Sequence, residues 1–150
     1  MNNELRKAIA EVLQADTVLL NLLSDKNVNW SVPEGDDTTP AKKWSIMPLD
    51  KFQYDKTKLP ALTIQMGDDN LIGTNLVETL VYIRCYNGSQ KTYVDITSAL
   101  DRVRQLLHRR RVNLTASTLI EMKWQGTSIE SLDQAWNLPY REIRFSVERV

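Results

Sequence analysis

Between Val77 and Tyr86 the chain reads VETLVYIRCY, a stretch in which two kinds of position alternate. One set is apolar apart from a threonine, and consists of Val77, Thr79, Val81, Ile83 and Cys85. The other set mixes charged, aromatic and aliphatic residues. Because successive side chains of a strand point to opposite faces of a sheet, this pattern predicts a long strand with one face in the core. The mixed second face is typical of an antiparallel sheet that is fully covered on one side only.

The same alternation recurs on both sides of this stretch. We predict further strands at residues 28–32, 62–66, 120–124 and 143–147. The sequence GDDN at residues 67–70 is rich in turn-forming residues, so we predict a turn there that ends the 62–66 strand. The mostly polar connection at residues 126–137 is predicted to be a surface loop.

Apolar residues at three- and four-residue steps predict helices elsewhere in the chain. Residues 91–108 are the clearest case, with a core stripe made of Tyr93, Ile96, Leu100, Val103 and Leu107. The opposite stripe is polar and includes Arg102 and Arg109. The same spacing of apolar residues in 1–24 predicts two further helices, and either Asp16 or Thr17 can cap the second one.

Residues 33–60 are the least regular part of the chain. Prolines recur along the segment, yet it also carries large apolar residues that a simple linker would lack. Long loops in compact domains are often functional. We therefore predict a long excursion loop, or arm, which packs partly on its own domain and partly on a partner. Trp44, Phe52 and Tyr54 are its candidate contact residues.

These elements together predict an α+β fold in a single domain spanning residues 1–150. The hairpin-like order of the strands favours a mostly antiparallel sheet of four to five strands, with the helices packed on one face. The second face would carry Leu80, Tyr82 and Tyr86. We expect the 33–60 arm or a neighbouring subunit to cover it.

Charge and cysteine content limit the classes of partner and compartment. The chain has 19 basic and 19 acidic residues, so as a whole it has no long-range attraction for nucleic acid or an anionic membrane. Its single cysteine, Cys85, cannot form an internal disulfide, which suits a reducing compartment. No secretory leader and no apolar run long enough to span a bilayer is visible. The default expectation is a cytoplasmic protein without membrane contact.

Residue types that carry catalysis are scarce. His108, the only histidine, stands beside three arginines at the predicted end of a helix, where a cation interacts favourably with the helix dipole. We interpret it as a capping or surface residue rather than a general base. Cys85 falls on the apolar face of its strand and is predicted to be a buried thiol. Without a second cysteine or a glycine-rich phosphate loop, we predict no catalytic residue, no metal ligand and no cofactor.

Glu121 and Lys123 offer one catalytic alternative. On a strand they would share a face, and such a pair with an upstream aspartate can hold a metal and activate water in a nuclease. The upstream acids Asp95 and Asp101 belong to the predicted helix, however, rather than to a neighbouring strand. A solvated strand face with alternating charge is the simpler interpretation. A small metal-dependent nuclease stays open as an alternative.

Basic residues are concentrated in residues 91–111, which contain six Lys or Arg against two Asp. Arg102 and Arg109 share the outer face of the predicted helix. The pattern predicts either a surface that faces phosphate or another subunit, or a solvated helix face with cations near its C-terminus.

Several segments resemble a known family. They are LPALTIQMGDD at residues 59–69, the long strand at 77–86, VDITSALDRVRQLLH at 94–108 and YREIRFSV at 140–147. With the leucine-rich N-terminal helices, they resemble the small tail-completion proteins of long-tailed bacteriophages, also called tail terminators or head–tail joining proteins. The resemblance covers residues 4–150, although the 33–60 segment is longer than the family leads one to expect. It is a pattern of elements rather than a catalytic signature.

The resemblance implies a non-enzymatic structural protein of the virion. It implies a ring, typically a hexamer, that completes the tail tube and joins it to the head connector. The implied partners are further copies of the chain, the major tail protein and the head-completion or connector protein, with DNA only passing through the lumen. The implied location is the tail at the head–tail interface, after assembly in the host cytoplasm.

A closed ring needs two different contact surfaces on each subunit. The residues that we expect at such an interface are Trp44, Phe52, Tyr54, Tyr82, Arg102 and Arg109. A third interpretation is a dimeric α+β binding module whose arm grips a peptide or nucleic acid.

Overall fold

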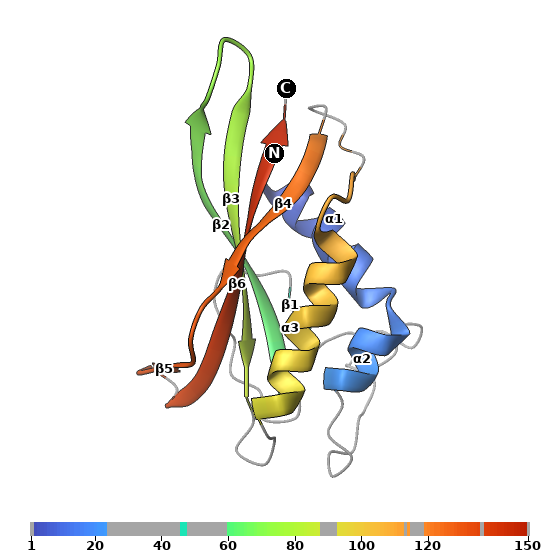
Figure 1. Cartoon of the computed structure of the whole chain (residues 1–150), viewed down its shortest axis with the longest axis vertical. Coiled ribbons are helices and arrows are strands. Elements are labelled where there is room, and N and C mark those ends of the chain that lie inside the picture. The colour runs from blue at the N-terminus through green and yellow to red at the C-terminus, as the bar shows by residue number, and fades with distance from the viewer. Residues whose placement is uncertain are drawn as a thin grey trace.

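The helices of this protein lie together on one side of a twisted sheet (Figure 1). The computed structural model describes residues 2–23, 46–47, 60–87, 93–112, 114, 119–135 and 137–149. In this part of the chain the helices are α1 (Asn2–Gln14), α2 (Thr17–Leu23) and α3 (Tyr93–Leu107). The strands are β1 (Ile46–Met47), β2 (Ala61–Leu71), β3 (Val77–Tyr86), β4 (Leu119–Thr127), β5 (Ser131–Asp133) and β6 (Leu138–Arg149). The predicted α+β class is confirmed.

The strands form one sheet in the order β1-β2-β3-β6-β4, and β5 pairs with β6. The β1–β2 pair is parallel, and the other pairs in the described residues are antiparallel, as predicted. The last strand, β6, lies between β3 and β4. Because α3 connects β3 to β4, it crosses over the inserted strand in a split β-α-β arrangement.

The turn predicted at residues 67–70 is wrong. β2 continues to Leu71, which pairs with Val77, and the pairing shifts between Met66 and Asp69. Gly67 and Asp68 are both opposite Leu80, so they form a β-bulge that lets the strand continue. A Cβ atom on Gly67 would lie 2.8 Å from Cε2 of Tyr82 and 3.1 Å from the backbone oxygen of Leu80. Close approach of a neighbouring strand therefore requires glycine here.

The prediction of a plain surface loop at residues 126–137 is also wrong. Part of this polar segment forms β5, which pairs with the start of β6. The segment before it is held by Ser128, whose N–H donates to the Glu142 carbonyl at 2.7 Å. The Ser128 hydroxyl accepts a hydrogen bond from the Glu142 N–H at 3.0 Å. Backbone hydrogen bonds order this connection, and the polarity of its side chains does not reveal them.

The core lies between the three helices and one face of the sheet. The predicted stripe of α3 is confirmed at each position whose side chain is described, since Ile96, Leu100, Val103 and Leu107 are all buried. The helices α1 and α2 and the sheet supply the rest, including Leu5, Ile9, Leu13, Leu19, Leu23, Leu62, Ile64, Val81, Ile83, Met122, Ile143, Phe145 and Val147. Phe145 is fully buried on β6, which is paired on both sides.

Two residues of the predicted 33–60 arm pack on the rest of the domain. Ile46 is fully buried in the same core, and β1 pairs with β2 at Leu62 and Thr63. The Gln14 side chain donates a hydrogen bond to the Ile46 carbonyl at 3.1 Å, which ties β1 to the end of α1. Trp44, Phe52 and Tyr54 lie outside the described residues, as does the strand predicted at 28–32.

Candidate interaction surfaces

The sheet face that points away from the helices, called the outer face below, centres on Glu142. Its carboxylate accepts a hydrogen bond from Nε of Arg84 at 2.8 Å and another from Nε of Arg144 at 3.1 Å. The Arg84 guanidinium lies 4.6 Å from the centre of the Tyr140 ring, and that of Arg144 lies 5.7 Å from the Tyr82 ring. Such cation–π contacts add to the ion pairs. The middle of the outer face is therefore occupied by a charged and aromatic network, rather than left half-apolar as predicted.

The network stabilises the positive charge on Arg84. Burial of its guanidinium is the largest single effect and acts to lower its pKa, but the hydrogen bond to Glu142, the hydrogen bond to Tyr86 and the charges of Tyr140 and Glu142 together raise the pKa above its usual range. Glu142 itself is only 7% exposed, which is unusual for a carboxylate without a partner. Sequence reasoning missed this network because its two main residues are 58 positions apart and meet only through the β3–β6 register.

Glu121 and Lys123 share the outer face, as predicted. Lys123 Nζ lies 3.4 Å from a carboxylate oxygen of Glu148 and 3.9 Å from one of Glu121. Glu78, Glu148 and Glu121 occupy neighbouring positions across β3, β6 and β4, with this lysine among them. In the part of the chain that the structure describes, no group of three metal-ligating residues is placed to hold an ion. Lys123 on β4 forms its shorter ion pair across strands, with Glu148 on β6, an arrangement that stabilises sheets.

Arg102 joins α3 to the start of α2. Its Nε donates to Oδ2 of Asp16 at 2.9 Å, and its Nη2 donates to Oδ1 at 2.8 Å. Asp16 also caps α2, as one of the two residues predicted to do so, because its Oδ2 accepts the N–H of Leu19 at 2.8 Å. The hydrogen bond from Arg102 holds the pKa of Asp16 below its usual value.

We expect Asp16→Ala to lower the free energy of unfolding by about 1 kcal/mol through loss of the cap alone. Asp16→Asn keeps a good capping side chain but loses the charge and one of the two oxygens that accept hydrogen bonds from Arg102. Because the folded-state pKa of Asp16 is lowered, its charge stabilises the fold above the unfolded pKa of 3.8 and ceases to do so as the pH falls through the folded value. Thermal melts should show wild type above Asp16→Asn at neutral pH and a shrinking gap on acidification. A gap that does not change with pH would contradict the ion pair.

The connection from α3 to β4 exposes three consecutive arginines. Arg109 follows the helix with a positive φ of 63°, and its N–H donates to the Met122 carbonyl at 2.7 Å. The Met122 N–H in turn donates to the Arg110 carbonyl at 3.2 Å. Since these backbone bonds hold the turn against β4, the side chains of Arg109, Arg110 and Arg111 point into solvent.

Next to this turn lie His108 and the exposed Trp124. Nδ1 of His108 accepts the backbone N–H of Trp124 at 3.0 Å, and the Arg104 guanidinium lies 5.1 Å from the centre of the indole ring. His108 is exposed, as predicted, and it bonds to β4 rather than to the last carbonyls of its helix. We call Trp124 and residues 109–111 together the arginine flank.

Exposed apolar residues gather at two ends of the molecule. The β2–β3 hairpin extends beyond the rest of the sheet, and near its tip Leu71 is 71% exposed and Ile72 is 46% exposed (Figure 1). At the other end of the sheet, Ile129, just before β5, is 83% exposed, and Leu132, within β5, is 54% exposed. The sequence carries a signal at both places, because Ile129 and Leu132 are apolar residues in the otherwise polar 126–137 connection, and Leu71 and Ile72 directly follow the predicted turn at 67–70. Exposed apolar groups of this kind mark interaction sites when they are contiguous.

Cys85 is fully buried on the core face of β3, as predicted. Burial raises the pKa of its thiol to about 12. A thiol of this kind is inert, because the thiolate is the reactive form.

The predicted interface residues do not converge on one site. Of those described, Tyr82 lies on the outer face, Arg102 at the α2–α3 contact and Arg109 at the turn into β4. Trp44, Phe52 and Tyr54 belong to segments outside the described residues. None of the described helices has the length and apolar character needed to cross a membrane.

Comparison with known proteins is informative at the level of structure. No family model matches the sequence, and no curated protein does. A chain in the solved virion of a native gene transfer agent (GTA) particle superposes with a TM-score of 0.59 at 14% sequence identity. The match covers 97% of this chain and 94% of that chain. This protein therefore has the fold of that virion chain over nearly its whole length.

Proposed function

We propose that this protein is a non-enzymatic structural component of a phage-like virion. The observation that carries the proposal is the shared fold, over nearly the full length of both chains, with a component of a gene transfer agent virion. A protein of this kind works through the surfaces that it presents to its neighbours. The exposed apolar ends of the sheet and the arginine flank are surfaces of that type.

Within the virion, the proposed role is tail completion. The 150 residues form one domain, and copies of it close a hexameric ring that ends the tail tube and joins it to the head connector. The ring contacts the major tail protein on one side and the head-completion or connector protein on the other, and DNA passes through its lumen. Support comes from the family resemblance of residues 59–69, 77–86, 94–108 and 140–147. It also comes from the presence of different exposed surfaces at different ends of the subunit, which a ring of head-to-tail contacts requires.

The test uses the full chain, alone and mixed with tail tubes assembled from the major tail protein of the same particle. Sedimentation velocity and negative-stain electron microscopy should show rings, or density that caps one end of the tubes. Two-fold dimers that ignore the tubes would contradict the proposal and favour the dimeric binding module. Magnesium-dependent DNA cleavage that is lost in Glu121→Ala would contradict it in favour of the nuclease.

A further inference from the structure

Charge is unevenly distributed along this electrically neutral chain. Residues 59–83 contain three acidic residues and no lysine or arginine. Residues 102–120 contain five arginines and no acidic residue. Folding leaves part of each set engaged, since Asp69 binds Arg149 at 2.8 Å and Arg102 binds Asp16. Of the remaining charges, the side chains of Asp68 and of the three arginines at residues 109–111 make no hydrogen bond or ion pair with any residue that the structure describes.

Two of the three acidic residues in 59–83, Asp68 and Asp69, lie on β2, whose edge away from β3 is mostly unpaired among the described residues. β1 covers that edge only at Leu62 and Thr63, so no strand among the described residues pairs with it from Ile64 onward. Asp68 lies in the bulge, where it is exposed and makes no hydrogen bond or ion pair with any described residue. The exposed Leu71 and Ile72 continue the same edge toward the hairpin tip. We call Asp68, Leu71 and Ile72 the acidic flank.

The arginine flank has matching properties. The guanidinium groups of Arg109, Arg110 and Arg111 are exposed, and none of them pairs with an acid in the part of the chain that the structure describes. Trp124, which is 38% exposed, adds an apolar surface beside them. Each flank therefore combines unpaired charge of one sign with an apolar group, a composition that suits an interface better than a solvated surface does.

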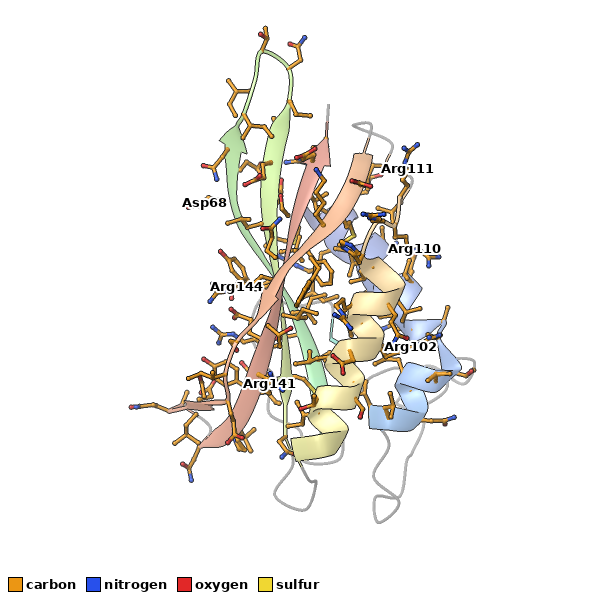
Figure 2. The ribbon with its side chains drawn as sticks, viewed as in Figure 1. Asp68, Arg102, Arg110, Arg111, Arg141 and Arg144 are labelled. Atoms are coloured by element: carbon orange, nitrogen blue, oxygen red, sulfur yellow. The ribbon has the colours of Figure 1, made fainter. Side chains whose placement is uncertain are left out.

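The two flanks lie on opposite sides of the molecule. β4 is at one end of the strand order, and β2 is next to the two-residue strand β1 at the other end. Figure 2 shows Asp68 on the β2 side and Arg110 and Arg111 on the far side, beside the end of α3. One subunit cannot bring its own flanks together. A second copy in a similar orientation can, and such a contact is heterologous, the type that closes rings.

We propose that the acidic flank of one copy packs against the arginine flank of the next, so that copies join head to tail. This inference rests on the proposed ring function and identifies the surfaces that build the ring. Each flank binds the opposite flank of a second copy of this protein. The two flanks have complementary charges, and both have exposed apolar groups. Charge complementarity then sets the orientation of neighbouring copies.

Charge reversal tests the pairing. Asp68→Lys and Arg110→Glu are each expected to weaken association about tenfold in sedimentation velocity, whereas the double variant recovers much of the loss because the charges are exchanged. Both side chains are exposed, so the thermal melts should stay unchanged. Glu130→Lys and Lys7→Glu, at exposed positions outside both flanks, are the matched controls and should associate as wild type does.

Cross-linking tests the geometry. Because Cys85 is buried and inert, cysteines introduced at positions 68 and 110 would be the reactive ones. Asp68→Cys and Arg110→Cys should each stay unlinked alone and form a disulfide-linked dimer when mixed under mild oxidation. The double cysteine variant should form a ladder of oligomers.

Three outcomes would overturn the inference. Efficient self-linking of either single cysteine variant would indicate a two-fold contact. Rings that form normally in each of the two single charge-reversal variants would show that other surfaces build them, and the proposed function would then stand without this inference. An Arg110→Glu variant that loses salt-dependent DNA binding but associates normally would assign the arginine flank to nucleic acid. By contrast, wild-type protein that forms no rings, even on tail tubes, would end the proposed function itself.

Discussion

Phe145→Ala is expected to lower the free energy of unfolding by about 4 kcal/mol, the usual cost of removing a fully buried aromatic side chain. Phe145 is completely buried on β6, and its register partners are Val81 on β3 and Trp124 on β4. The core helices cover the same face, so the cavity has little room to collapse. A domain of this size is stable by only about 5–15 kcal/mol, so the variant should melt about 10 °C below wild type.

Urea denaturation followed by circular dichroism measures this change. Phe145→Leu keeps most of the apolar volume and should lose less than about 1.5 kcal/mol. Leu132→Ala removes an exposed side chain and should change stability by less than about 0.5 kcal/mol. A loss below about 1 kcal/mol in Phe145→Ala would mean that the Phe145 side chain is not packed in the core between β6 and the helices.

Glu142→Ala has the second largest expected effect. The substitution removes the carboxylate that accepts hydrogen bonds from Arg84 and Arg144, and it leaves the Arg84 guanidinium, whose side chain is 31% exposed, without its main acceptor. Loss of a charged acceptor in a partly buried site costs about 2 kcal/mol. The same urea titration should show this loss.

Glu121→Ala is the matched control on the same face. Glu121 lies 3.9 Å from Lys123, whose side chain is 42% exposed. A surface ion pair of this kind contributes less than about 1 kcal/mol. Equal effects of the two substitutions would show that the Glu142 network adds nothing beyond ordinary surface charge. Glu142→Gln, which keeps an acceptor without the charge, should fall between wild type and Glu142→Ala.

Local periodicity predicts an element well when its apolar residues follow the helix or strand repeat over the whole element. The α3 stripe is confirmed at each position whose side chain is described, and the alternation in β3 correctly placed Val81, Ile83 and Cys85 in the core, whereas Val77 is only partly buried. Local turn chemistry was less reliable. The GDDN segment looks like a turn, but in the structure its first two residues form a bulge and β2 continues, because a neighbouring strand supplies the pairing.

The amino-acid sequence by itself determined the α+β class, the buried faces of α3 and β3, the buried Cys85 and a helix cap at either Asp16 or Thr17. Each of these depends on residues within a few positions of one another, so the periodicity of a single helix or strand is enough to reveal it. Only the tertiary structure decided that β6 lies between β3 and β4. That insertion places Glu142 between Arg84 and Arg144, and the packing of α3 on α2 brings Arg102 to Asp16 across 86 positions. The placement of the acidic and arginine flanks on opposite sides of the molecule depends on strand order and register, which are set by pairings between distant segments and leave no local pattern in the chain.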